Sequence, residues 1–209
     1  MSTTKYNDQL ISDITQYDNN NIIFDQSKIY NYDGKETNLY VGIWTKNPDN
    51  TTGQLLFTVP EDITIGFKPK QRDEHLVGIR ITDEIYTKLT DIVSLCKSHI
   101  DKVDDTFVHS FEKMTGCLQS WNKKILQVKC LDSKTMNLEK DGSFVPVKAK
   151  DLPYSNLESN MYQIKPVIRL KSIHRVNDTT FVKWTLHEAD VKYYTSAISR
   201  TSLLHPKNK

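Results

Sequence analysis

Residues 161–186 read MYQIKPVIRLKSIHRVNDTTFVKWTL, and this stretch decides the fold. Side chains two positions apart along a β-strand point to the same face. Counted this way, the first half of the stretch has one apolar face and one face with four cations. The apolar face holds Ile164, Pro166, Ile168 and Leu170, and the other holds Lys165, Val167, Arg169, Lys171, Ile173 and Arg175. The pattern predicts a strand with a buried side and a basic side.

A turn and a return strand follow. Asn177 and Asp178 are typical turn residues. The return strand puts Val182, Trp184 and Leu186 on one face and Phe181, Lys183 and Thr185 on the other. We expect Trp184 to be part of the core. A hairpin with a basic, partly aromatic face suits a surface that follows a phosphate backbone. The alternative is the solvated outer face of an ordinary sheet.

Two further segments repeat this pattern. Residues 38–46, NLYVGIWTK, carry Leu39, Val41 and Ile43 on one face and Tyr40, Trp44 and Lys46 on the other. Residues 120–131, SWNKKILQVKCL, carry Leu126, Val128 and Cys130 opposite Trp121, Lys123, Ile125, Gln127 and Lys129. Proteins that bind single strands combine a basic groove with aromatic faces on which bases stack. Trp44 and Trp121 could instead be covered by other parts of the chain.

These faces give the candidate binding residues. They are Tyr40, Trp44, Lys46, Trp121, Lys123, Lys129, Lys165, Arg169, Lys171, Arg175, Phe181 and Lys183.

The composition is that of a soluble globular protein. The chain has 209 residues, 37% of them hydrophobic and 26% charged. It has no apolar run of the roughly 20 residues that a membrane helix needs, and no signal peptide is visible at its start. Its three cysteines, Cys96, Cys117 and Cys130, lack CxxC spacing, which argues against both disulfides and a zinc site. We therefore expect a cytoplasmic protein without a membrane partner.

The formal net charge of +2 hides an asymmetry along the chain. Residues 1–117 hold 12 Lys and Arg against 18 Asp and Glu, whereas residues 118–209 hold 16 against 8. Such segregation is compatible with a nucleic-acid partner for the second half.

The order of predicted elements is strands, a helical block and strands again. Strands are expected at 54–59, 62–68, where Gly66 suggests a bulge or a close backbone approach, and 76–81. Thr82 should cap a helix with Ile85, Leu89, Ile92, Val93, Cys96 and Ile100 at core spacing, and a second helical piece should begin near Asp104. The fold class is mostly β or α+β. We expect an OB-like antiparallel Greek-key barrel with inserted helices at about 82–115 and extra strands.

A single domain is expected over residues 31–198. Residues 1–30 are polar and rich in Asn, and are interpreted as a flexible arm with short ordered pieces. Residues 199–209 are interpreted as a frayed tail.

Little in the sequence supports catalysis. The six histidines are scattered, none lies at metal-ligand spacing from a cysteine, and there is no Gly-rich phosphate loop or GxSxG motif. Helix starts explain two of the three acidic pairs. We expect a protein that is not an enzyme, with no metal and no cofactor.

The segment 165–173, KPVIRLKSI, a short turn, and residues 181–186, FVKWTL, resemble the C-terminal part of a family of single-stranded DNA-binding proteins. The family occurs in large cytoplasmic DNA viruses, and the cytoplasmic linear plasmids of yeasts are related replicons. The resemblance covers about 30 residues. It implies an OB-like core and binding that protects single strands in replication or recombination. Arg169, Lys171, Phe181 and Lys183 match positions of that hairpin.

The sequence thus predicts a sequence-independent single-stranded DNA-binding protein, with RNA left open as a ligand. It would self-associate on DNA or contact replication proteins. One rival is a structural or interaction protein of a virion or replication complex, whose outer aromatics form a protein interface. A second is a sequence-specific duplex binder, for which no helix-turn-helix or zinc finger is visible.

Overall fold

The computed structural model describes residues 3–6, 9–32, 36–70, 74–102, 117–120, 123–131, 133–151, 161–176 and 179–194. Its strands are β1 Thr3–Tyr6, β2 Gln9–Asp13, β3 Ile22–Phe24, β4 Lys28–Tyr32, β5 Glu36–Lys46, β6 Thr52–Thr58, β7 Asp62–Lys70, β8 Glu74–Ile81, β9 Cys117–Ser120, β10 Lys123–Leu131, β11 Thr135–Lys140, β12 Ser143–Lys148, β13 Met161–Val176 and β14 Thr179–Tyr194. Within these residues the α-helix is α1, Asp83–Asp101, and 3₁₀ turns lie at Asn19–Asn21 and Ala149–Asp151. The protein is therefore mostly β, as predicted.

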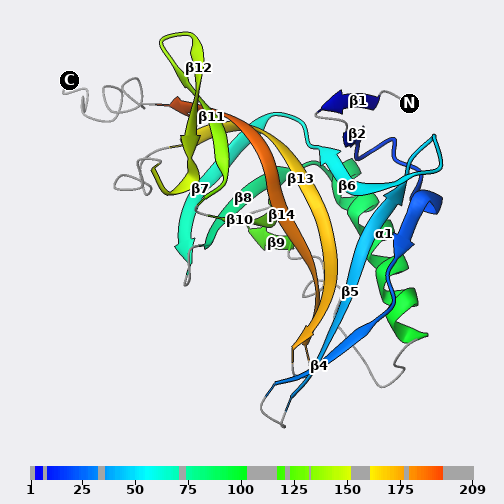
Figure 1. Cartoon of the computed structure of the whole chain (residues 1–209). Helices are drawn as coiled ribbons and strands as arrows, with labels where there is room; N and C mark the ends of the chain where they lie inside the picture. Colours follow the sequence, from blue (N-terminus) through cyan, green and yellow to red (C-terminus); the bar gives the residue numbers. More distant parts are fainter. Residues whose placement is uncertain are drawn as a thin grey trace, which may run out of the picture.

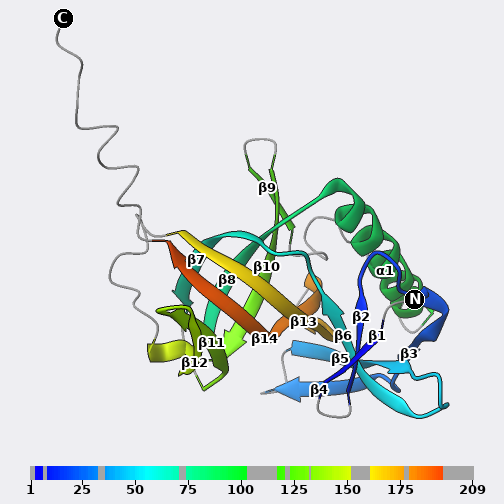
Figure 2. The same ribbon diagram turned by 90° about the horizontal axis from the view of Figure 1, so that it is seen from above.

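The long hairpin β13–β14 runs through the whole molecule. Each strand has 16 residues, which corresponds to about 50 Å of extended chain. Figure 1 shows β5, β6 and α1 beside one end of this hairpin and β11 and β12 at the other. The same separation is visible from above in Figure 2. The predicted hairpin is confirmed, and it holds the two ends of the fold together.

The sheet is curled and mixed, and it forms a half-barrel that does not close. β13 pairs antiparallel with β7, β7 with β8, β8 with β10, and β14 with β13. β10 runs parallel to β14, but the two strands are paired only at Lys129 and Thr185. The expected antiparallel barrel is therefore not closed, because one residue pair between β10 and β14 is too little to seal it.

Helix α1 begins where the sequence predicts. Thr82 caps it, and the Thr82 hydroxyl accepts a hydrogen bond from the backbone N–H of Ile85 at 3.3 Å. The buried positions are the six that helical spacing predicts: Ile85, Leu89, Ile92, Val93, Cys96 and Ile100. The helix ends at Asp101, and the second helical piece expected from Asp104 lies outside the described residues.

One core connects the helix with the inner face of the sheet. It includes Trp184, which is 2% exposed, together with Cys96 and Cys130, so these three are core residues as predicted. Burial raises the pKa of the Cys96 thiol to about 12, which keeps this cysteine protonated and unreactive. No helix in the described part of the chain is both long and apolar enough to cross a membrane.

Part of the segment interpreted as an arm belongs to the sheet and the core. β2 pairs in parallel with β6, and β3 and β4 pair with β5. Ile14 and Tyr17 are buried, and the Tyr17 ring lies edge-on against Phe57 at 5.1 Å between centroids. The domain thus extends toward the N-terminus beyond the predicted boundary. The expected C-terminal tail, 199–209, lies outside the described residues.

Candidate nucleic-acid interface

A β-bulge at Lys171 divides β13 into two parts with opposite face patterns. Leu170 is paired with Trp184 and Ser172 with Lys183, so Lys171 is the extra residue. An extra residue reverses the alternation beyond it. Ile173 is consequently buried in the core, and His174 lies on the face that carries Arg169. We call this surface, on the side of the sheet opposite the core, the outer face.

Three aromatic rings form a row across the outer face. His174 is paired with Tyr40 of β5 and with Phe181 of β14. The rings of His174 and Phe181 are stacked, with centroids 5.5 Å apart and planes 9° apart. The Tyr40 ring meets His174 edge-on at 5.1 Å. All three side chains are half-buried, so the row presents ring surface to solvent.

Cations lie beside this row on three strands. Arg169 is paired with Thr185, and Thr185 with Lys129, so these side chains lie in one line across β13, β14 and β10. Lys183 lies on β14 between Thr185 and Phe181. The Nε atom of Arg169 is buried and has no hydrogen-bond partner within the described part of the chain. The row of rings and the line of cations are therefore adjacent.

Both burial and nearby cations act on the pKa of His174. Burial, followed by Lys183, Lys129 and Lys171, lowers it to about 4. The imidazole is therefore neutral at physiological pH, and its Nε2 atom shares a hydrogen bond of 2.7 Å with the Ser172 hydroxyl. Ser172 is fully buried, so this pair orients the ring and offers no accessible nucleophile.

Trp44 is held from two sides. Its indole Nε1 donates a hydrogen bond to the Asp25 carboxylate at 2.8 Å. The Arg169 guanidinium lies 5.6 Å from the ring centroid, within cation–π range. Asp25 fits here because the neighbouring residue in the sheet is Gly42, where a Cβ would overlap the carboxylate. Trp44 is half-buried and fixed in orientation, so it is a partly exposed platform.

One acidic residue lies among the lysines. The Glu74 carboxylate, from β8, is 3.4 Å from Lys129 Nζ and 3.8 Å from Lys183 Nζ. Glu74 thus compensates part of the positive charge of the outer face.

The remaining predicted residues have different positions. Lys165 is exposed and lies on the same side of β13 as Arg169, four residues earlier. Lys46 is exposed at the end of β5. Arg175 is paired with Leu39 and Thr180, both buried, so its expected place on the cationic face is wrong; the bulge moves it to the side of Ile173. Trp121 and the side chain of Lys123 lie outside the described residues.

Sequence reasoning missed His174, Glu74 and Asp25. His174 had a signal: Ile173 interrupts the cation series, which indicates a change of face at that point. Glu74 and Asp25 had none, because each reaches the outer face through contacts with residues far away in the sequence.

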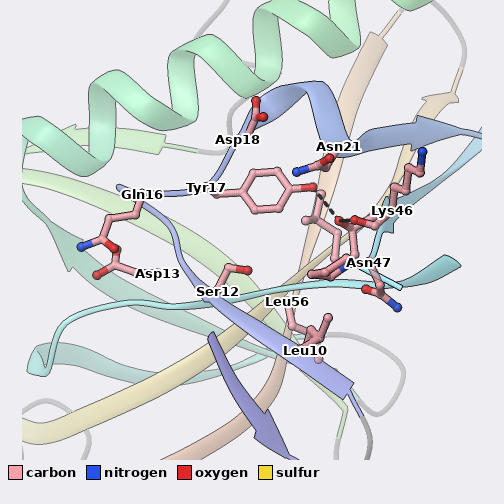
Figure 3. A pocket seen from close by; sticks show the side chains of 13 residues that line it. Leu10, Ser12, Asp13, Gln16, Tyr17, Asp18, Asn21, Lys46, Asn47 and Leu56 are labelled. Carbon is pink, nitrogen blue, oxygen red and sulfur yellow. Dashed lines mark hydrogen bonds between the residues drawn. The ribbon is translucent and has the colours of Figure 1, made fainter. Parts of the chain in front are cut away.

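A small cavity lies apart from the outer face. It has a volume of about 70 Å³ and lies between the segment after β2 and the ends of β5 and β6. Figure 3 shows the Tyr17 ring among the side chains that line it. The hydroxyl groups of Tyr17 and Thr45 share a hydrogen bond of 2.7 Å. A cavity of about 150 Å³ accepts benzene, so this one is too small for a nucleobase.

Within the described residues, no group of three or more His, Cys, Asp or Glu side chains could hold a metal ion. No known family matches the chain, and no curated protein matches it in sequence. The residues of the outer face therefore carry the functional argument.

Proposed function

We propose that the protein binds single-stranded DNA without sequence preference on its outer face. Lys129, Arg169, Lys171 and Lys183 hold phosphates, and bases stack on Phe181 and Trp44, with Tyr40 at the end of the aromatic row. The observation that carries the proposal is that half-buried rings and cations from β5, β10, β13 and β14 adjoin on one surface. Each stacked base contributes about 1–3 kcal/mol and any base can stack, which explains binding without sequence preference.

The electrostatics of His174 support this assignment. Burial lowers its pKa most, and Lys183, Lys129 and Lys171 add to the effect, so cations gather beside the aromatic row. A positive potential next to exposed rings attracts an anionic chain and leaves its bases in contact with the rings.

The strand pairing supports an OB-type core, which the family resemblance implies. In an OB fold the first strand pairs with the second and fourth, and the third runs parallel to the fifth. Taken as strands one to five, β7, β8, β10, β13 and β14 have these pairings. OB folds bind oligonucleotides over the second and third strands and are often partly open. Lys129 and Glu74 belong to those strands here.

A protein-binding role is the second candidate. Phe144 and Val145 of β12 are 50% and 40% exposed, and Leu131 at the end of β10 is 56% exposed. Such side chains favour a protein contact. Salt distinguishes the two functions, because an apolar interface survives high salt and a phosphate interface does not.

The test is a titration with oligo-dT followed by tryptophan fluorescence. Trp184 is buried, so Trp44 is the described tryptophan that can report stacking, and Trp44→Phe is the control for its signal. We expect quenching that salt reverses, with a slope of log K against log salt near −3, from about −0.7 for each of four phosphates. Duplex of equal length should bind weakly, and oligo-U tests RNA. Absence of binding at low salt would refute the proposal.

A further inference from the structure

Glu74 lies between two lysines that come from different strands. Its Oε2 atom is 3.4 Å from Lys129 Nζ on β10, and its Oε1 atom is 3.8 Å from Lys183 Nζ on β14. The three side chains are 20–28% exposed, so solvent still reaches them. One carboxylate thus bridges two ammonium groups, with one oxygen directed to each.

This arrangement has the chemistry of a phosphodiester site. A phosphodiester also presents two oxygens that share one negative charge, and lysines bind such groups as point charges. The Glu74 carboxylate oxygens therefore stand where the two non-bridging oxygens of a backbone phosphate would lie. The site is also adjacent to Phe181, two residues before Lys183 on the same face of β14, so a nucleotide bound there could reach the rings with its base.

Several cations lie around the Glu74 carboxylate. Two lysines face one carboxylate, and Lys171 and Arg169 are nearby on β13. Lys183, Lys129 and Lys171 also lie close enough to His174 to lower its pKa, in addition to the larger effect of burial.

We propose that Lys129 and Lys183 form a phosphodiester subsite, which the Glu74 carboxylate occupies in the free protein and leaves when single-stranded DNA binds. The inference rests on the proposed function and adds a regulatory device to it. Glu74 competes with the ligand, which lowers the affinity and speeds release of the strand. It also disfavours weaker anions that cannot displace a carboxylate.

The experiment compares Glu74→Gln with wild type in binding a fluorescein-labelled oligo-dT, followed by anisotropy at several salt concentrations. Glutamine keeps the size of the side chain and removes its charge. The matched control is Glu139→Gln. The Glu139 carboxylate also lies 3.4 Å from a lysine nitrogen, Lys192 Nζ. Lys192 is nine residues after Lys183 on β14, which corresponds to about 30 Å of strand, so this pair is far from the proposed subsite.

We expect Glu74→Gln to bind about five-fold more tightly than wild type near physiological salt, with a slope more negative by about 0.7. Glu139→Gln makes the same change in net charge and should differ from wild type by less than about two-fold. In a Lys129→Ala/Lys183→Ala background, Glu74→Gln should no longer raise the affinity, because the subsite is gone.

Other outcomes overturn the inference in recognisable ways. If Glu74→Gln and Glu139→Gln behave alike while wild type binds, the subsite is refuted and the proposed function stands. If Glu74→Gln binds more weakly and unfolds at lower temperature, the ion pairs of Glu74 stabilise the packing of β8, β10 and β14. The inference is then wrong as well. If none of the three proteins binds oligo-dT at low salt, the proposed function fails and the inference falls with it.

Discussion

At the residue scale, Phe181 offers the most direct test of stacking. Its ring is half-buried and stacked on His174, so truncation removes ring surface from the outer face without opening the core. We expect Phe181→Ala to weaken binding of oligo-dT by about 1–3 kcal/mol, with a much smaller change in stability. Binding is measured by anisotropy and stability by urea unfolding.

The control for this substitution is Phe144→Ala, which removes an exposed phenylalanine from β12, away from the outer face. It should leave the affinity unchanged. Equal losses in both variants would mean that Phe181 has no special role, and a large loss of stability in Phe181→Ala would identify its ring as structural.

Gly42 is the second residue with a sharp expectation. A methyl group there overlaps the Asp25 carboxylate, which must then leave the Trp44 indole. We expect Gly42→Ala to shift the emission of Trp44 and to destabilise the protein by no more than about 1 kcal/mol, because the exposed Asp25 side chain can rotate away at the cost of its hydrogen bond. The measurement is urea unfolding together with the fluorescence spectrum.

A double-mutant cycle checks the cause. Asp25→Ala removes the overlapping group, so Asp25→Ala/Gly42→Ala should lose less stability than the two single changes together. Strict additivity would show that the loss has another origin, such as the backbone of β5.

At the element scale, β12 is the edge strand at one end of the sheet, and β1 is at the other end. Asp141 and Gly142 have positive φ angles of 51° and 78°, as in the two-residue turn that joins β11 and β12. Lys140 and Ser143 form the closing, hydrogen-bonded pair of this hairpin. Because hydrogen-bonded and non-hydrogen-bonded pairs alternate, the pair of Asn137 and Pro146 is non-hydrogen-bonded, and the Pro146 nitrogen faces away from β11. Proline has no N–H there, so a further strand cannot pair fully with this edge.

Replacing this proline should expose the edge. We expect Pro146→Thr to increase concentration-dependent self-association, detected by light scattering, because the edge gains a donor next to Phe144 and Val145. Ser143→Thr is the control, since the N–H of residue 143 already faces β11. A Pro146→Thr variant as monodisperse as wild type would show that other features protect the edge.

How much could be predicted from sequence also depends on the element. Helix α1 and its six buried positions followed from 3.6-residue spacing and the Thr82 cap, both of which are local. The bulge expected at Gly66 agrees with the register shift between Thr64 and Phe67. The bulge at Lys171 was missed because no glycine marks it, and the error moved Arg175 to the wrong face.

The candidate site was predicted only in part, because some of its residues meet through contacts between strands that are distant in sequence. Alternation along single strands identified Phe181, Lys183 and Arg169. It could not identify Glu74, which meets Lys129 and Lys183 only after three strands distant in sequence have assembled. The openness of the half-barrel also depends on how the strands meet in space.

At the scale of the whole molecule, two histidines couple stability to pH. The pKa values of His174 and His187 are lowered from 6.5 to about 4, mainly by burial, with Lys183, Lys129 and Lys171 adding to the effect at His174 and Lys134 and Arg169 at His187. Between these values the unfolded chain binds protons that the folded protein does not. Stability should therefore fall as the pH is lowered from about 6.5 to 4.

The measurement is the urea midpoint as a function of pH. His174→Gln should make the decline less steep, because this group no longer titrates, whereas His187 and His99, whose pKa values are also lowered, still do. A midpoint that stays constant between pH 6.5 and 4 would contradict the burial of both rings.

The single residue pair between β10 and β14 has a consequence for how the protein opens. Because β10 and β14 are joined by one residue pair, this contact, which we call the seam, should separate more readily than the long ladder between β13 and β14. The backbone amides at the seam should therefore exchange with deuterium early. Lys129 and Lys183 stand on opposite sides of the seam. A DNA strand bound by both lysines would therefore connect β10 with β14. The bound ligand would close the half-barrel at the place where the polypeptide alone leaves it open.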